Sequence, residues 1–242
     1  MASPRAPLDD DRRASAGSVA KIAPMATEGS APKESRQGVM DDELPRRLRA
    51  ERERRRISVR ELARRLDVTP SAISQIETGR ARPSVATLFA IVTELDMSLD
   101  ALFDHEAGSG SRGRADQGLS RVIVRDSERE ALDLSTGVRW ERLTADADPE
   151  VDFLHVVYEP GGASSPPGQL MRHAGREYGL ILSGRLEITL GFETRELGPG
   201  DSLSFDSTSP HRLANTGDEP VKAVWVVLGR HGSDPRTEGF GQ

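Results

Sequence analysis

The hydrophobic period of this 242-residue chain changes once along its length, from the spacing of a helix to the spacing of a strand. Apolar residues between Asp41 and Phe103 recur at intervals of three and four, which indicates amphipathic helices. Beyond a glycine-rich stretch, residues 104–118, apolar and polar residues alternate in short runs, which indicates β-strands. This order predicts two domains of different class in one chain.

The remaining segments follow neither period. Residues 1–40 mix Ala, Ser, Pro, Gly and charged side chains, and we expect a disordered N-terminal tail there. Residues 104–118 are predicted to form a flexible linker, and residues 233–242 a C-terminal tail. The predicted domains therefore span residues 41–103 and 119–232.

Composition excludes several classes of protein. The chain has no cysteine, so it cannot form disulfides or thiolate metal sites. No apolar run approaches the roughly 20 residues that a membrane-spanning helix requires, and the N-terminus lacks the apolar core of a secretory signal. We therefore expect a cytoplasmic protein that does not associate with a membrane.

Charge is distributed unevenly along the chain. The net charge is −6, yet residues 46–82 contain twelve arginines and five acidic residues, a local charge of +7. The rest of the chain must therefore carry −13. A compact basic segment on an acidic protein predicts a local anionic partner, whereas the alternative is a solvated helix face.

Capping residues divide residues 41–103 into five expected helices. Ser58-Val-Arg-Glu61 is a capping box, in which the serine and glutamate side chains bond free backbone amides at a helix start. Thr69 can cap the following helix, with a proline in its first turn. These two short helices form a candidate helix-turn-helix, with Asp67 in the turn because an aspartate tolerates unusual backbone angles. The other three helices are expected to begin near Asp41, Ser84 and Ser98.

The stretch RELARRLDVTPSAISQIETGRARPSVATLFAIVTEL resembles the DNA-binding domain of the XRE family, the phage-repressor and Cro-like regulators. The resemblance covers Glu43 to Phe103, and its main departure is Asp67, where the family often has glycine. It implies a five-helix fold in which the second helix of the motif enters the DNA major groove.

This resemblance also implies which residues contact DNA. The residues implied to face base edges are Pro70, Ser71, Ser74 and Gln75. Gln75 can offer a paired donor and acceptor to adenine. Phosphate contacts, which position the protein rather than read the sequence, are implied for Arg60, Arg80 and Arg82.

Short β-rich runs fill the second half of the chain. The expected strands are RVIVR, GVRWERL, DFLHVVYE, YGLIL, RLEITL, SLSFD, HRLAN and KAVWVVL. Many short strands separated by Gly, Pro, Ser or Asp predict an antiparallel sandwich or barrel.

The octapeptide MRHAGREY places His173 and Glu177 four residues apart. In a straight strand these residues would share a face but lie about 13 Å apart, too far to bind one ion at about 2.1 Å. The chain must therefore bend between them if both are ligands, and Gly175 suits a bulge. His211 is the third candidate, and two histidines with one carboxylate form the ligand set of non-haem iron sites.

Residues 151–230 resemble the cupin superfamily, specifically the small cupin domain that follows XRE domains in many bacterial regulators. The matching residues are His173-x3-Glu177, Ser183-Gly-Arg185, Leu197-Gly-Pro-Gly-Asp201 and Pro210-His211-x3-Asn215. The resemblance implies an antiparallel β-barrel, the double-stranded β-helix. Met171 stands where the first cupin motif ordinarily has another histidine, which puts a four-ligand site in doubt and leaves a three-ligand site open.

Three interpretations of His173, Glu177 and His211 stay open at this point. They could bind a divalent metal (Fe, Zn or Mn) that helps a small effector to dock. They could also form a metal-free polar lining that hydrogen-bonds the effector. Finally, they could be residual structural groups or a catalytic centre. The other histidines are weaker candidates: His105 in the linker, His155 in a predicted strand and His231 near the C-terminus.

Together these features predict a one-component transcription regulator rather than an enzyme. We expect it to bind a double-stranded DNA operator as a homodimer, because one short recognition helix reads few bases, and to act as a repressor. A small-molecule effector would shift the two DNA-binding heads through the linker or through dimer contacts.

Two other classes of protein fit the sequence less well. A mononuclear iron epoxidase acting on a hydroxyalkylphosphonate has the same domain order and a similar ligand set, but the arginine-rich stretch favours DNA binding. An antitoxin is disfavoured, because the large sensing domain would have no evident role.

Overall fold

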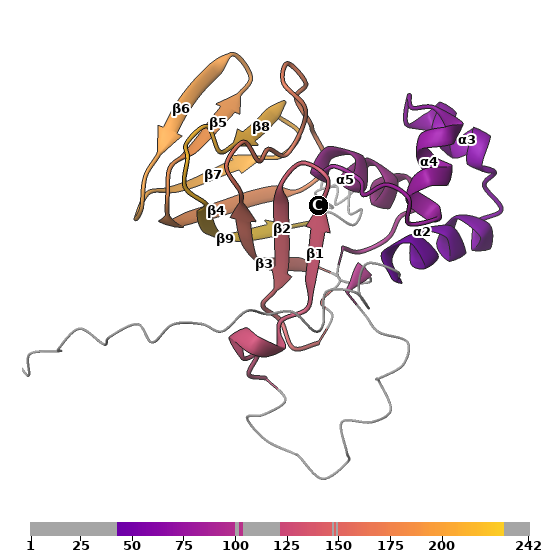
Figure 1. Ribbon diagram of the computed structural model, residues 1–242, viewed down its shortest axis with the longest axis horizontal. Helices are drawn as coiled ribbons and strands as arrows, with labels where there is room; N and C mark the ends of the chain where they lie inside the picture. Colours follow the sequence, from indigo (N-terminus) through magenta and orange to yellow (C-terminus); the bar gives the residue numbers. More distant parts are fainter. Residues whose placement is uncertain (1–42, 100–101, 104–121, 147, 149, 230–242) are drawn as a thin grey trace, which may run out of the picture. The chain divides into compact units, whose positions relative to one another are not determined.

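The computed structural model of the chain describes residues 43–99, 102–103, 122–146, 148 and 150–229. Its helices precede its strands in sequence (Figure 1), and all of them belong to one compact unit, Ser35–Gln242. The predicted N-terminal tail, linker and C-terminal tail lie outside the described residues. Their boundaries therefore stay predictions. No helix in the described part of the chain is both long and apolar enough to cross a membrane.

The helical domain contains four α-helices in its described residues. They are α2 (Glu43–Arg54), α3 (Val59–Arg65), α4 (Pro70–Glu77) and α5 (Val85–Glu94). The prediction of five helices was wrong for this part of the chain. Where the fifth was expected, the amide of Leu102 bonds the carbonyl of Leu99 at 2.9 Å, an i to i+3 bond typical of a single tight turn.

Side-chain caps begin three of these helices where the sequence predicts them. Hydroxyl oxygens accept backbone N–H bonds of 3.1 Å at Ser58, 3.2 Å at Thr69 and 3.0 Å at Ser84. Asp67 has φ 53°, the left-handed backbone expected for the turn. The carboxylate of Glu61 completes no capping box and instead accepts bonds from the guanidinium groups of Arg64 and Arg65.

A buried ion pair fixes α4 against α2. The guanidinium of Arg52 donates to both carboxylate oxygens of Glu77, at 2.6 and 2.8 Å, and to the carbonyl of Ile57 at 2.8 Å. Both charged side chains are buried. A two-point contact of this kind sets orientation as well as distance, so it fixes how α4 presents its outer face.

The β domain consists of two antiparallel sheets. The larger sheet has the order β1 (Ala131–Leu134), β2 (Val138–Arg142), β3 (Val151–Tyr158), β9 (Val221–Leu228), β4 (Arg176–Ser183) and β7 (Ser202–Asp206). The smaller sheet has the order β6 (Glu193–Leu197), β5 (Leu186–Leu190) and β8 (His211–Ala214). In Figure 1 the smaller sheet carries the labels β5, β6 and β8.

The expectation of a closed barrel was wrong for the described residues. The two sheets share no hydrogen-bonded ladder, and only isolated bridges, Ala163–Ala214 and Met171–His211, add to the free side of β8. The segment that supplies them, GGASSPPGQLM, is rich in glycine and proline. Since proline has no N–H to give to a ladder, this segment cannot form the strand that would close a barrel.

Most of the predicted strands are confirmed. The exception is RVIVR, because residues 122–125 form no strand and Val122 is 72% exposed. A 3₁₀ turn, η3 (Asp126–Glu128), follows this segment. Strands β1 and β6 are absent from the predicted set, because β1 is short and the side chains of β6 are mostly exposed and polar and therefore carry no alternating pattern.

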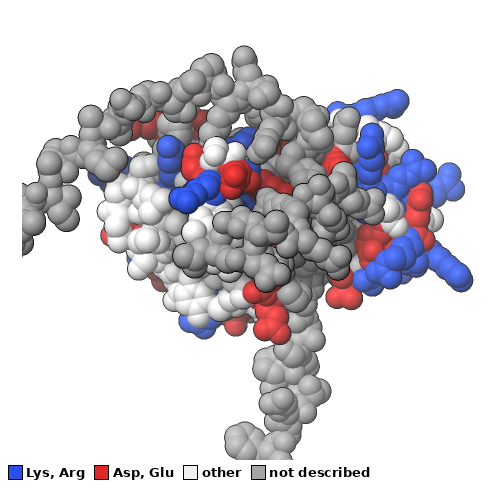
Figure 2. All heavy atoms as spheres, turned by 90° about the horizontal axis from the view of Figure 1, so that it is seen from below, with Lys and Arg blue, Asp and Glu red and all other residues white. Residues whose placement is uncertain are grey.

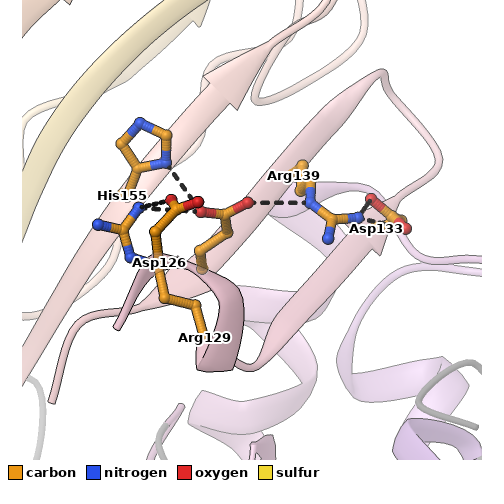
Figure 3. Close-up of polar contacts among 6 residues, drawn as sticks. Asp126, Arg129, Asp133, Arg139 and His155 are labelled. Atoms are coloured by element: carbon orange, nitrogen blue, oxygen red, sulfur yellow. Dashed lines mark hydrogen bonds and ion pairs between the residues drawn. The ribbon is translucent and has the colours of Figure 1, made fainter. Parts of the chain in front are cut away.

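A polar network ties η3 to strands β1, β2 and β3 (Figure 3). Glu141 lies at its centre and accepts from Arg139 at 3.2 Å and Arg129 at 3.3 Å, while His155 Nδ1 lies 3.1 Å away. Arg139 also donates to both carboxylate oxygens of Asp133. His155 is thus half-buried in an ion-pair network, and this network lowers the pKa of Glu141 to about 2, chiefly through its bond with His155.

The lowered pKa of Glu141 predicts a loss of stability in acid. The network favours the ionised carboxylate, so the stabilisation is present above the ordinary pKa and is lost as pH falls toward about 2. Glu141→Gln should unfold at lower urea than the wild type at about pH 7, and the gap should narrow by about pH 3. The exposed Glu193→Gln should match the wild type at both values. A gap that is independent of pH would contradict this account.

Candidate functional site

The chain bends between His173 and Glu177, as the metal hypothesis requires. Gly175 has φ 106°, a conformation that side chains other than glycine rarely adopt, and β4 begins immediately after it. The amide of Ser207 bonds the carbonyl of Gly175 at 3.0 Å, and the amide of His173 bonds the carbonyl of Ser207 at 3.0 Å. These bonds hold the bend, so His173 lies off the line of β4 and can turn toward Glu177.

His173, Glu177 and His211 converge from three parts of the β domain. The Nε2 atoms of His173 and His211 lie 2.9 and 3.2 Å from the same oxygen, Oε1 of Glu177. One ligand atom from each residue lies within 4.8 Å of the others. The three residues are 7%, 3% and 1% exposed, in chain order, so the cluster is nearly shielded from solvent.

Backbone carbonyls orient both imidazole rings. Nδ1 of His173 lies 2.9 Å from the carbonyl of Ala174, and Nδ1 of His211 lies 2.9 Å from the carbonyl of Ser209. A carbonyl oxygen only accepts hydrogen bonds, so each Nδ1 must carry the proton. In the neutral rings the lone pairs are therefore on Nε2 and point toward Glu177, which is the arrangement of metal-binding histidines.

Trp225 orients the carboxylate from the other side. Its indole Nε1–H donates to Oε2 of Glu177 at 2.7 Å, which leaves Oε1 for the two histidines. The indole fits because its neighbour on β4 is Gly179, where a Cβ atom would lie 2.3 Å from the Trp225 ring. In the sequence, Trp225 is one residue of the predicted strand KAVWVVL and has no pattern that marks it as part of a site. The glycine inside the strand YGLIL was the signal that a ring crosses there.

The electrostatics of the cluster favour a negative carboxylate beside a positive charge. Burial by itself opposes ionisation of Glu177, but the adjacent imidazoles of His173 and His211, when they carry a proton on Nε2, outweigh burial and lower the pKa of Glu177. Burial likewise acts to lower the pKa of His211, yet the adjacent Glu177 raises it. Tyr158 is buried nearby, and its pKa is raised by burial and by the charge of Glu177, so its hydroxyl stays neutral.

This donor set fits a divalent cation. Nε2 of His173 and Oε1 of Glu177 are buried and have no hydrogen-bond partner among the described residues. With Nδ1 protonated, two lone-pair atoms face one carboxylate oxygen, so the site needs a positive charge, either a proton or a metal ion. Two histidines and one carboxylate would hold such an ion and leave open positions for other ligands.

Met171 occupies the place of the histidine that the first cupin motif ordinarily has. Its side chain is buried, and its main chain exchanges two 2.9 Å hydrogen bonds with His211. Met171 therefore helps to place His211 through its backbone. The ligand set that could hold a metal consists of three residues.

Aromatic rings surround the two histidines. Phe205 meets His211 edge to face at 4.9 Å between centroids, and His173 and His211 meet in the same way at 5.3 Å. The ring of Phe89, from α5, is stacked on His173 at 4.2 Å with 6° between the planes. The sequence analysis missed Phe89, because it lies far from the cluster in sequence and has the spacing of an ordinary core residue.

The residues predicted to contact DNA all lie at the surface of the helical domain. Those exposed side chains are Arg60, Pro70, Ser71, Ser74, Gln75, Arg80 and Arg82. Gln75 is 3.4 Å from Ser71 across one turn of α4, so the two side chains share a face. Figure 2 shows Lys and Arg side chains gathered over the helical domain, with acidic groups between them.

Most arginines of this basic surface are already paired with acids of the domain. Arg49 pairs with Glu53, and Arg64 and Arg65 both pair with Glu61. Arg60 and Arg80, by contrast, form no ion pair with any described residue. These two guanidinium groups are therefore available to phosphates, a distinction that the charge count of the sequence did not reveal.

Known protein families match both the helical domain and the β domain of this chain. A family described as "Helix-turn-helix" matches residues 48–102, and one described as "Cupin domain" matches residues 154–227. The chain is 25% identical over 173 residues to the HTH-type transcriptional regulator PuuR of Escherichia coli K12, covering 71% of this chain and 86% of PuuR.

Solved structures give two further likenesses. An HTH_3 family transcriptional regulator from Vibrio cholerae superposes with a TM-score of 0.56 at 22% identity, covering 79% of this chain and 97% of that one. Hydroxypropylphosphonic acid epoxidase from S. wedmorenis matches with a TM-score of 0.37 at 23% identity, covering 78% and 98% of the two chains. The first likeness shows a shared fold, and the second is too weak to support an argument about chemistry.

The convergence of donors predicts metal binding that depends on His173 and His211. Untagged protein incubated with Fe²⁺, Zn²⁺ or Mn²⁺ and then dialysed should retain about one equivalent of ion by elemental analysis. The double variant His173→Ala/His211→Ala should retain little, while His155→Ala, which alters a histidine of the Glu141 network, should bind like the wild type. Retention below about a tenth of an equivalent by the wild type would rule out a tight metal site.

Proposed function

We infer that this chain, which joins an XRE-type helix-turn-helix domain to a cupin domain, is a sequence-specific DNA-binding transcription regulator. Two relatives that match 71% and 72% of this chain are HTH-type transcriptional regulators. Operator binding would place its work in the cytoplasm. We further propose that it acts as a repressor, since an operator-bound protein of this size can exclude other proteins from a promoter.

The observation that carries this proposal is the exposed face of α4 beside unpaired cations. Arg52 and Glu77 hold α4 so that its Ser71, Ser74 and Gln75 side chains point outward. We propose that these side chains, with Pro70, face base edges in the major groove. Arg60 and Arg80, together with Arg82, would contact the phosphates on either side.

We propose that the cupin domain senses a small molecule at His173, Glu177 and His211. Two interpretations from the sequence are supported by the geometry: a divalent metal with open positions, and a polar lining that carries a proton instead. Both supply a positive charge beside a buried carboxylate, so an anionic or oxygen-rich effector would suit the site. The third interpretation, a catalytic iron centre like that of an epoxidase, is not favoured, because the relatives that match most of the chain are transcriptional regulators.

We propose that the regulator is a homodimer that pairs through the outer face of β4. Tyr178, Leu180 and Leu182 alternate along this strand and are 41%, 41% and 47% exposed. Their neighbours on the same face, Val224 and Val226 of β9, are only half-buried. A second copy is the partner that the function requires, because an eight-residue recognition helix reads one half-site and two copies read a palindrome.

DNA binding is tested with separate variants for phosphate and base contacts. Arg80→Ala should weaken binding to all duplexes and reduce the salt slope by about 1, whereas Gln75→Ala should cost about 1–3 kcal/mol and relax the sequence preference. Affinities would be measured on duplexes selected from a random library. Arg185→Ala, an exposed arginine of the β domain, is the control and should bind like the wild type. Failure of the wild type to retain any duplex at low salt would refute the proposal.

The dimer is tested by placing a charge on the apolar face. Leu180→Asp should shift the protein from dimer to monomer in sedimentation experiments and weaken operator binding, since a buried unpaired carboxylate opposes association. Phe192→Asp changes a more exposed apolar residue in the β5–β6 turn and should leave the dimer intact. A wild-type monomer at concentrations that saturate the operator would contradict this arrangement.

A further inference from the structure

Phe89 is the one described residue of the helical domain whose side-chain ring contacts the histidines of the cluster. Its ring lies parallel to the imidazole of His173, with 4.2 Å between the centroids, and edge-on to Trp140 at 5.5 Å. Phe89 is buried, so the stack is closed off from solvent. A helix of the DNA-binding domain therefore covers one face of a potential metal ligand.

Helix α5 is fixed at both of its faces. On the side of the β domain, the amide of Ala86 bonds the carbonyl of Ser164 at 2.9 Å, and Phe89 adds its ring stack. On the other side, Leu88 and Val92 are fully buried in the core of the helical domain. A movement of Phe89 must therefore be taken up by the core on which α3 and α4 also pack.

The connection from α5 to the DNA-binding surface is short. Ser84 caps α5 and follows the loop that carries Arg80 and Arg82 at the end of α4. The carbonyl of Pro83, in the same loop, accepts a 3.0 Å hydrogen bond from the amide of Ser135 at the end of β1. A change in the placement of α5 would thus alter the loop whose arginines lie nearest to the recognition helix.

A ligand bound at the cluster would act directly on the contact between Phe89 and His173. The three donor residues are almost fully buried, and the ring of Phe89 covers His173. A metal ion at Nε2 would fix the imidazole and give it positive charge, which strengthens its attraction to an aromatic face. An effector larger than an ion, by contrast, would have to displace side chains that bury the cluster in order to reach it.

We propose that Phe89 is a positioning residue that couples ligand occupancy at His173, Glu177 and His211 to the placement of the DNA-reading helices. The coupling passes through the contact between α5 and the β domain, and it does not require the linker. It rests on the proposed function, because it assumes that α4 binds DNA. Such coupling is reciprocal, so a ligand that changes DNA affinity must have its own affinity changed by DNA by the same factor.

The test measures this factor with Co²⁺ as the probe. DNA affinity for a selected duplex would be measured with and without Co²⁺, and Co²⁺ affinity, from its visible absorption, with and without DNA. In the wild type each should change the other by about 5-fold or more. In Phe89→Leu the factor should fall to near unity while Co²⁺ and DNA still bind separately, and Phe89→Tyr, which keeps the ring, should restore it.

Phe192→Leu is the matched control, because it makes the same change in the β5–β6 turn, at an exposed residue that belongs to neither the cluster nor α5. It should keep the coupling factor of the wild type. An unchanged factor in Phe89→Leu would overturn this inference alone, as would a wild type that binds DNA and shows no coupling or no Co²⁺ binding. A wild type that binds no DNA would overturn the proposed function and the inference together.

Discussion

The buried carboxylate of Glu177 is the group around which the β domain is organised. Its two oxygens are divided between different partners, Oε2 with the indole of Trp225 and Oε1 with His173 and His211. A buried charge is costly unless it is paired, so these partners must be placed accurately for the domain to be stable. Gly179 makes room for the indole, and Gly175 permits the bend that turns His173 inward.

A second buried pair of charged residues fixes the arrangement of the helical domain. Arg52 and Glu77 join α2 to α4 through two hydrogen bonds, and their burial protects them from screening by salt. Exposed arginines such as Arg49 and Arg64, in contrast, form local pairs with acids one turn away, which contribute little to stability. The domain therefore has a rigid buried ion pair in its interior and exposed arginine side chains on its surface. This arrangement suits a protein that binds a polyanion.

In the proposed coupling, helix α5 connects the two domains. Helix α5 shares its apolar residues with the DNA-binding core and presents Phe89 to the imidazole of His173. A sensor of this kind needs no large cavity, because a change at a buried cluster is transmitted by close packing. It does need a ligand that binds one arrangement better than the other, and a cluster that demands positive charge provides such a distinction.

The sequence by itself determined the order of the domains, the helix caps, most of the strands and the identity of the three converging donors. These features are local: a serine caps the helix that follows it, and alternation marks a strand whose two faces differ in burial. Even the bend at Gly175 followed from the distance that a straight strand would impose.

Only the tertiary structure decided what depends on contacts between distant segments. The described residues contain four helices and two sheets in place of five helices and a closed barrel, and residues 122–125 form no strand, because hydrogen bonds and burial there depend on partners that no local pattern encodes. Trp225 and Phe89 reach the cluster from 48 and 84 residues away in the chain, counted from Glu177 and His173. Likewise, pairing with acids of the same domain decides which arginines remain available to DNA.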